Sequence, residues 1–212
     1  MPSPQRRDCT GRGAHGAPPT IGLGLACALL AGCANTGLPS AFADALATSP
    51  EDVAARLHID GDRVVSAAAA SGPGGIPQVV RATIDGVAPG GEVVFEGREW
   101  GPFGACFRVE KRYVEGPEHT FRSALIADNG AVLERSHSVP IPRVPPAILA
   151  TALTLGRDVQ RCEIVSDSSV EREWRATVVD GGGRTMMATI DLDGRLLDAH
   201  RIVHAVITTP RR

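Results

Sequence analysis

The chain has 212 residues, of which 43% are hydrophobic, 22% charged and 4% aromatic. This is enough apolar material for one or two small domains, so disorder along the whole chain is excluded. The formal net charge is −2 and Lys111 is the only lysine, so the sequence lacks the basic block typical of nucleic-acid binding. The 24 Gly and 16 Pro exclude a helical bundle and predict short elements joined by turns.

Residues 1–32 have the order of a bacterial export signal, with three arginines before an apolar stretch at 21–31. Twelve helical residues would span about 18 Å, short of the ~30 Å hydrocarbon core, so this stretch is a poor membrane span. The run Leu-Ala-Gly-Cys that ends at Cys33 resembles the lipobox of bacterial lipoproteins. The resemblance implies cleavage after Gly32 and a lipid anchor on Cys33. An ordinary signal peptide with a cysteine at this position is the alternative.

The same resemblance indicates the location. Ala34, in place of Asp, favours the periplasmic side of an outer membrane if the cell has one. Residues 33–49 are rich in Ala, Thr, Ser and Gly without periodicity, and we expect them to form a lipidated tether.

Residues 50–75 are predicted to hold an N-terminal helix and a linker. Ser49 is a suitable N-cap, followed by a first-turn proline and two acidic residues, so a short helix is expected up to about Asp60. Residues 64–70 fit either a strand or a helix. The Gly- and Pro-rich run at 71–75 then predicts a break in the chain.

The remaining sequence repeats one plan in residues 76–141 and 142–207. A proline-started apolar segment at 76–83 corresponds to one at 144–151, and each predicts a helix of about ten residues. Segment 123–139 aligns without a gap on 187–203, and each predicts a hairpin that turns on Asn-Gly or Asp-Gly. Two further strands are expected in each copy, at 92–97 and 105–114 and at 161–166 and 172–179.

Side-chain alternation in the second strand predicts a half-buried sheet. Phe107, Val109 and Tyr113 alternate with Arg108, Glu110 and Arg112, and we expect the second row to be a solvated face. A single helix must cover the apolar sheet face of each copy. The predicted fold class is therefore α+β: two tandem repeats, each with one short helix packed on a four-stranded antiparallel meander.

Two cysteines, Cys106 and Cys162, follow Cys33 in the chain. An extracytoplasmic compartment would allow a disulfide between them. The alternation puts Cys106 on the face away from the core, whereas Cys162 shares a face with Ile164, so a disulfide is disfavoured.

Each copy combines a proline-started helix, an aromatic residue in the second strand (Phe107 or Trp174) and a glycine turn (Gly130 or Gly194). This plan resembles the PepSY-like modules, and the tandem arrangement resembles the β-lactamase-inhibitor-like proteins. The resemblance implies an extracytoplasmic, non-catalytic module that binds other proteins, in some cases an enzyme or protease. Trp174 departs from the tyrosine usual at its position, which leaves the partner open.

Motifs for catalysis or metal binding are missing from the sequence. His200 and His204 would lie about 13 Å apart on one strand, too far to bind one metal ion. The run from Asp191 to Gly194 begins like a calcium loop, but the glycine comes too early, so a turn is predicted. No nucleophile elbow, phosphate loop or paired metal-ligand motif occurs. We therefore expect no catalytic residues, no metal and no cofactor.

A turn between two strands of the first copy carries the residues best suited to bind a partner. Arg98, Trp100 and Phe103 combine an arginine with two large aromatics, the types enriched at interface hot spots. The expected function is a lipid-anchored, non-catalytic cell-envelope protein that binds or inhibits an unknown envelope protein. The alternative is an accessory lipoprotein of outer-membrane assembly.

Overall fold

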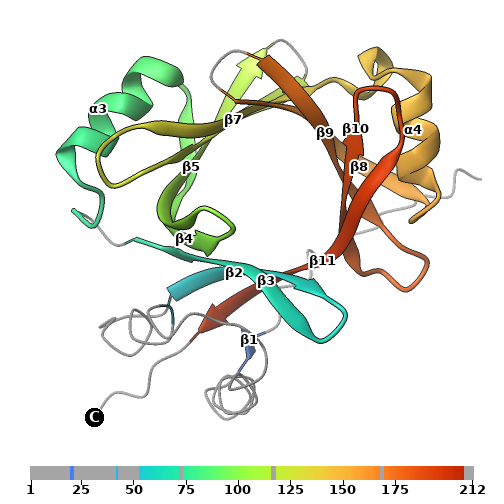
Figure 1. Cartoon of the computed structure of the whole chain (residues 1–212), viewed down its shortest axis with the longest axis horizontal. Helices are drawn as coiled ribbons and strands as arrows, with labels where there is room; N and C mark the ends of the chain where they lie inside the picture. Colours follow the sequence, from blue (N-terminus) through green and yellow to red (C-terminus); the bar gives the residue numbers. More distant parts are fainter. Residues whose placement is uncertain are drawn as a thin grey trace, which may run out of the picture.

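The computed structural model describes residues 20–21, 42, 53–71, 74–115, 118–167 and 170–207. Ten antiparallel strands, each hydrogen-bonded to the next along the chain, form one sheet that closes on itself (Figure 1). They are β2 (Val53–Asp60), β3 (Arg63–Ala70), β4 (Glu92–Gly101), β5 (Gly104–Glu115), β6 (Glu118–Ile126), β7 (Val132–Val139), β8 (Asp158–Asp167), β9 (Val170–Val179), β10 (Thr185–Asp191) and β11 (Leu196–Ile207). A two-residue strand, β1 (Thr20–Ile21), adds to β11 in parallel outside this barrel.

The predicted α+β fold with two separate helix-on-sheet repeats is wrong, because two sets of strand pairs join the halves. The last strand of the first meander, β7, pairs with the first strand of the second, β8, through residues 135–139 and 162–166. The hairpin β2–β3 bridges the other gap, since β3 pairs with β4 and β2 pairs with β11 over seven residue pairs. No sheet edge remains in the ring of ten strands.

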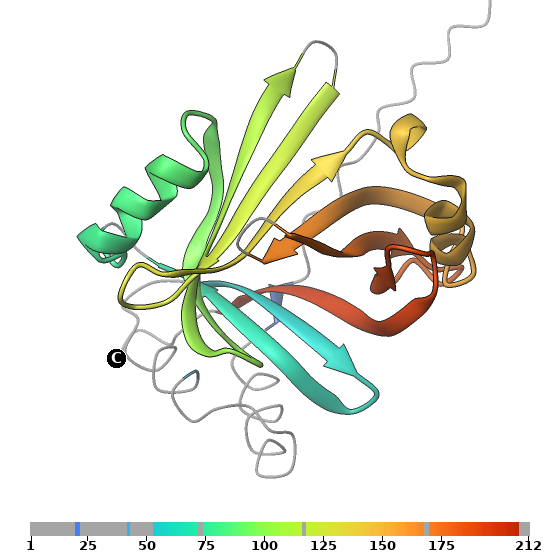
Figure 2. The same cartoon turned by 45° about the horizontal axis from the view of Figure 1, so that its top comes forward.

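The predicted helices and meanders within each half do occur. Helix α3 (Gln78–Val87) precedes β4 to β7, and α4 (Pro146–Leu153) precedes β8 to β11, after a 3₁₀ turn, η1 (Ile141–Arg143). Both helices lie outside the barrel, on different sides of it (Figures 1 and 2). Each helix begins directly after a proline, whose fixed φ suits a helix start.

The two halves fasten their helices in the same way. Thr83 of α3 donates its hydroxyl hydrogen to the carbonyl of Gly130 (3.0 Å), and Thr151 of α4 does the same to Gly194 (2.5 Å). Both glycines have positive φ, +85° and +92°, as these hairpin turns require. A Cβ at Gly130 would lie 2.8 Å from a methyl carbon of Val79, so a larger residue would push the helix away.

The hydrophobic core lies on the outer face of the barrel, in three clusters. One packs α3 against Phe107, Val109, Ala124 and Ile126, and the second packs α4 against Trp174, Ala176, Ala188 and Ile190. The third covers β2 to β4, where Phe42 meets the ring of Trp100 edge-on with 5.3 Å between centroids. The helices and Phe42 therefore bury the outside of the sheet.

The short helix expected near residues 50–60 is not found; Val53–Asp60 forms β2 instead. Val53, Ala55 and Leu57 pack in the outer cluster, while Arg56 and His58 point to the interior. This period of two suits a strand, and pairing with both β3 and β11 overrides the local helix-start signal.

Candidate functional site

The interior of the barrel is charged, which the sequence did not lead us to expect. Arg108 and Glu110, predicted to lie on a solvated face, project inward, and Glu110 is only 4% exposed. Arg112, further along the same row, is more exposed and pairs with Glu92 at 2.5 Å. Closure of the sheet explains the difference, because it turns the polar face of the meander into an inner wall.

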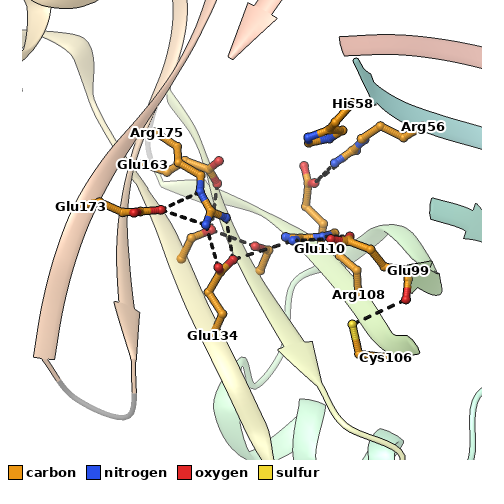
Figure 3. Close-up of polar contacts among 12 residues, drawn as sticks. Arg56, His58, Glu99, Cys106, Arg108, Glu110, Glu134, Glu163, Glu173 and Arg175 are labelled. Atoms are coloured by element: carbon orange, nitrogen blue, oxygen red, sulfur yellow. Dashed lines mark hydrogen bonds and ion pairs between the residues drawn. The ribbon is translucent and has the colours of Figure 1, made fainter. Parts of the chain in front are cut away.

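Glu134 of β7 is the centre of one group of charges (Figure 3). It accepts two hydrogen bonds from Arg175 (2.6 and 2.7 Å) and lies 3.7 Å from Arg108. Arg108 also forms an ion pair with Glu99, and Arg175 bonds Glu173 at 2.9 Å. Burial alone would raise the pKa of Glu134, but the bonds from Arg175 and the charge of Arg108 hold it below its usual value.

Glu110 of β5 is the centre of a second group. Arg161 donates to one carboxylate oxygen at 2.7 Å, and Arg56 lies 3.4 Å from the other. These arginines lower the pKa of Glu110 although burial raises it. Each arginine also covers an aromatic ring, Arg56 that of Phe95 (5.1 Å) and Arg161 that of Phe121 (4.8 Å).

A histidine pair lies inside the barrel where β2 meets β11. Nδ1 of His58 is 2.9 Å from Nε2 of His200, and Nδ1 of His200 is 3.3 Å from Asp198. Burial, then the neighbouring His200 and the charges of Arg108, Arg56 and Arg175, hold the pKa of His58 well below its ordinary value. Burial also lowers the pKa of His204, further along β11. His58 is therefore neutral at physiological pH and can share one hydrogen bond with His200.

A cavity of about 270 Å³ lies beside these charges, lined by Arg56, Arg161, Glu110 and His204 among others. Both arginines pair with Glu110, and Arg161 also pairs with Glu163 at 3.1 Å, but the buried Nε–H groups of Arg56 and Arg161 have no hydrogen-bond partner among the described residues. Among the described residues, no group of three or more His, Cys, Asp or Glu side chains could hold a metal ion. The described part of the interior wall therefore consists mainly of paired charges.

Cys106 and Cys162 are both free and buried. Cys162 packs in the cluster under α4, whereas Cys106 lies near Glu99 and Gly104. Burial, followed by the charge of Glu99, raises the pKa of the Cys106 thiol to about 12, and burial raises that of Cys162 to about 11. Both side chains are protonated at neutral pH, a state in which a thiol is a poor nucleophile.

The three residues predicted to bind a partner differ in their surroundings. Trp100 is 5% exposed and contacts Phe42. Arg98 bonds both carboxylate oxygens of Asp128 at 3.1 Å and lies over the ring of Phe107. Phe103, at the turn between β4 and β5, is 57% exposed. Phe103 is therefore the member of the set that a partner could reach directly.

Several predicted features fall outside the described residues. Cys33 and the cleavage site after Gly32 are among them, as is the tether at 33–49 apart from Phe42. In the part of the chain that is described, no helix is both long enough and apolar enough to cross a membrane.

Four members of the two charge groups were not predicted from the sequence: Glu134 and Arg175 in the first, and Arg56 and Glu163 in the second. Each lies on a strand next to apolar residues, as expected for a solvated face. The available signal was the recurrence of arginines and glutamates at alternating positions on successive strands, where opposite charges can pair across the sheet.

Comparison with known proteins gives weak likenesses. No family model and no curated protein matches the chain. A protein provisionally described as periplasmic, from Bacteroides eggerthii, has 11% identity and a TM-score of 0.43 over 59% of this chain and 88% of its own. A DUF2874 family protein from Bacteroides uniformis has 12% sequence identity and a TM-score of 0.43, again over 59% of this chain and 88% of its own. A BLIP-like protein from Bacteroides fragilis has 16% sequence identity and a TM-score of 0.38, over 64% of this chain and 89% of its own. These TM-scores are too low to carry an argument about function.

Proposed function

We propose that this chain is a non-catalytic lipoprotein of the bacterial cell envelope that binds another protein through the outer surface of its barrel. The charged interior carries the proposal, because its arginines and glutamates neutralise one another within hydrogen-bonding distance. Breaking such buried pairs to admit a ligand would cost several kcal/mol per charge. A rigid barrel whose interior is occupied in this way can still present turns and grooves on its outside.

The proposed location in the cell envelope rests on the lipobox-like run that ends at Cys33 and on the export signal before it. The neighbour provisionally described as periplasmic agrees with this location but adds no weight to it. A diacylated cysteine with a third acyl chain would hold the protein stably at a membrane, whereas one chain would not.

The anchor is tested by expressing the full chain and its variants in a bacterial host and separating membranes from soluble protein. We expect the wild-type protein in the membrane fraction, with acyl chains on Cys33 by mass spectrometry. Cys33→Ala should lose the lipid and appear as soluble protein or as precursor. Cys27→Ala, six residues upstream in the apolar stretch, is the matched control and should stay anchored. Mature Cys33→Ala that remained on the membrane would refute the anchor.

Protein binding is tested by cross-linking and purifying the lipidated protein from envelope extracts. A specific protein that co-purifies with the chain supports the proposal. If this protein no longer co-purifies with Phe103→Ala, the β4–β5 turn is part of the contact surface. Trp100→Ala is unsuitable for this purpose, because removing a buried ring would disturb the barrel. Recovery of outer-membrane assembly machinery alone would favour the accessory role instead, and recovery of no protein would overturn binding.

A further inference from the structure

A groove on the outside of the barrel separates the two helices. It has a volume of about 500 Å³, and its floor is formed by residues of β6 and β7. Its walls are Val87 and Ala88, where α3 ends, and Pro140 and Arg143, where the chain passes to the second half. In Figure 1, β7 lies between α3 and α4, which marks this position. Phe121, Ser123 and Ser136 line both this groove and the interior cavity, which are therefore neighbours.

The groove is basic. Arg122, Arg135, His137 and Arg143 line it and are exposed, and none of its described lining residues is acidic. This is notable in a chain whose formal net charge is −2. Arg122 lies over the ring of Tyr113, with 4.7 Å to the centroid.

Three of these side chains are not committed elsewhere. Within the described part of the chain, Arg135, His137 and Arg143 form no ion pair or side-chain hydrogen bond, in contrast to the arginines inside the barrel. Arg122 and His137 are directly opposite each other in the β6–β7 pairing. Arg122, which lies over Tyr113, and His137 therefore lie side by side on the floor of the groove.

A buried polar atom in the groove also lacks a partner. The hydroxyl of Thr120 has no hydrogen-bond partner among the described residues, although it is buried. Thr120 lines the groove together with Ser138 and Ser166. A buried hydroxyl without a partner is costly, and a bound segment that brought a backbone or carboxylate group would remove the cost.

We infer that this groove binds an extended acidic segment of another protein. The basic side chains would pair with its carboxylates, the hydroxyls would bond its backbone, and Val87, Val139 and Pro140 would contact its apolar side chains. A concave groove suits a peptide better than a flat bilayer surface. Moreover, Phe42, the described residue nearest in sequence to Cys33, packs against β2 to β4, which β5 separates from the groove strands β6 and β7. This inference rests on the proposed function and names the surface that performs it.

The probe is a fluorescently labelled peptide in which Asp and Glu alternate with Ser and Val, and binding to the full chain is measured by anisotropy. The same peptide with Asn and Gln at the acidic positions should not bind. The double variant Arg135→Glu, Arg143→Glu should bind roughly tenfold more weakly or worse, about 1.4 kcal/mol. Arg63→Glu, an exposed residue at the start of β3, is the matched charge control and should bind as the wild type.

Equal losses in the control and the double variant would overturn the inference, as would unchanged binding in the double variant. Inorganic phosphate that displaced the peptide at low concentration, or groove-dependent binding to phosphatidylglycerol vesicles without peptide binding, would also overturn it. Thermal unfolding of the double variant should match the wild type, because both residues are exposed and unpaired.

The envelope purification separates this inference from the proposed function. If the cross-linked partner is recovered with the wild type and lost with the double variant, both hold. If the partner is retained by the double variant, the groove assignment fails while protein binding stands.

Discussion

The two halves of the barrel share a plan but differ in how they use it. In both, a threonine on the helix bonds the glycine of the third hairpin, and an aromatic residue, Phe107 or Trp174, packs beneath the helix. Equivalent arginines, Arg108 and Arg175, both point inward to Glu134. The repeated part therefore builds the scaffold and its charged centre.

The outer surfaces of the halves have diverged. Arg135, in the basic groove, aligns with Ala199 of the second half, and Arg122 aligns with Met186. The charge of the groove is thus not part of the repeated plan. Glu134 aligns with Asp198, which is 59% exposed and contacts His200 rather than an arginine. The comparison teaches that the helix-fastening threonines and the inward-pointing arginines occur in both halves, whereas the central carboxylate Glu134 and the basic groove belong to the first half alone.

The largest expected effect tests whether the halves are one folding unit. Phe107→Ala and Trp174→Ala each remove a buried aromatic side chain and should lower the free energy of unfolding by about 3–5 kcal/mol. Because one closed sheet joins the halves, urea unfolding of each variant should be a single transition by circular dichroism and by tryptophan fluorescence. Two separate transitions would show that the halves unfold independently.

The next effect tests the shared carboxylate. Glu134→Gln removes the negative charge that both Arg108 and Arg175 contact. It should lower the free energy of unfolding by about 3 kcal/mol. Asp198→Asn, at the aligned position of the second half, should cost less than about 1 kcal/mol because that side chain is largely exposed. Urea unfolding at neutral pH measures both values, and equal losses would contradict the central position assigned to Glu134.

The smallest effect concerns pH. The folded-state pKa of His58 lies below its unfolded value of about 6.5, so the unfolded chain binds the extra proton and stability falls as the pH drops below that value. The loss is at most about 1.4 kcal/mol per pH unit from this residue. Glu110 and Glu134, whose pKa values are also lowered, add to the loss only below about pH 4.5.

His58→Gln should flatten the pH dependence of stability between pH 7 and 5, because glutamine does not titrate. Glu134→Gln, measured in parallel, should leave the slope in that range unchanged. A slope that persisted in His58→Gln would assign the effect to other groups, His204 among them.

Local sequence signals predicted the elements of each half but not their assembly. Prolines before α3 and α4, and the turns at Gly130 and Gly194, marked helices and hairpins that the structure contains. Closure depends on pairs such as Val139 with Cys162 and Arg201 with Ile59, which lie far apart in sequence and have no local signature. The charged inner face was misread for the same reason, since an enclosed face and a solvated one both alternate apolar with polar residues.

The contact between Phe42 and Trp100 has a consequence for the proposed anchor. Phe42 follows Cys33 by nine positions, and a fully extended chain over that interval spans only about 30 Å. With acyl chains on Cys33, the side of the barrel formed by β2 to β4 would be held close to the lipid headgroups. The barrel could not move far from the membrane or rotate freely above it. The height and tilt of the barrel above the bilayer would then depend on the contact of one aromatic ring, Phe42, with the barrel. Phe42→Ala would remove this contact and increase the possible distance between barrel and membrane, while the lipid on Cys33 would be unchanged.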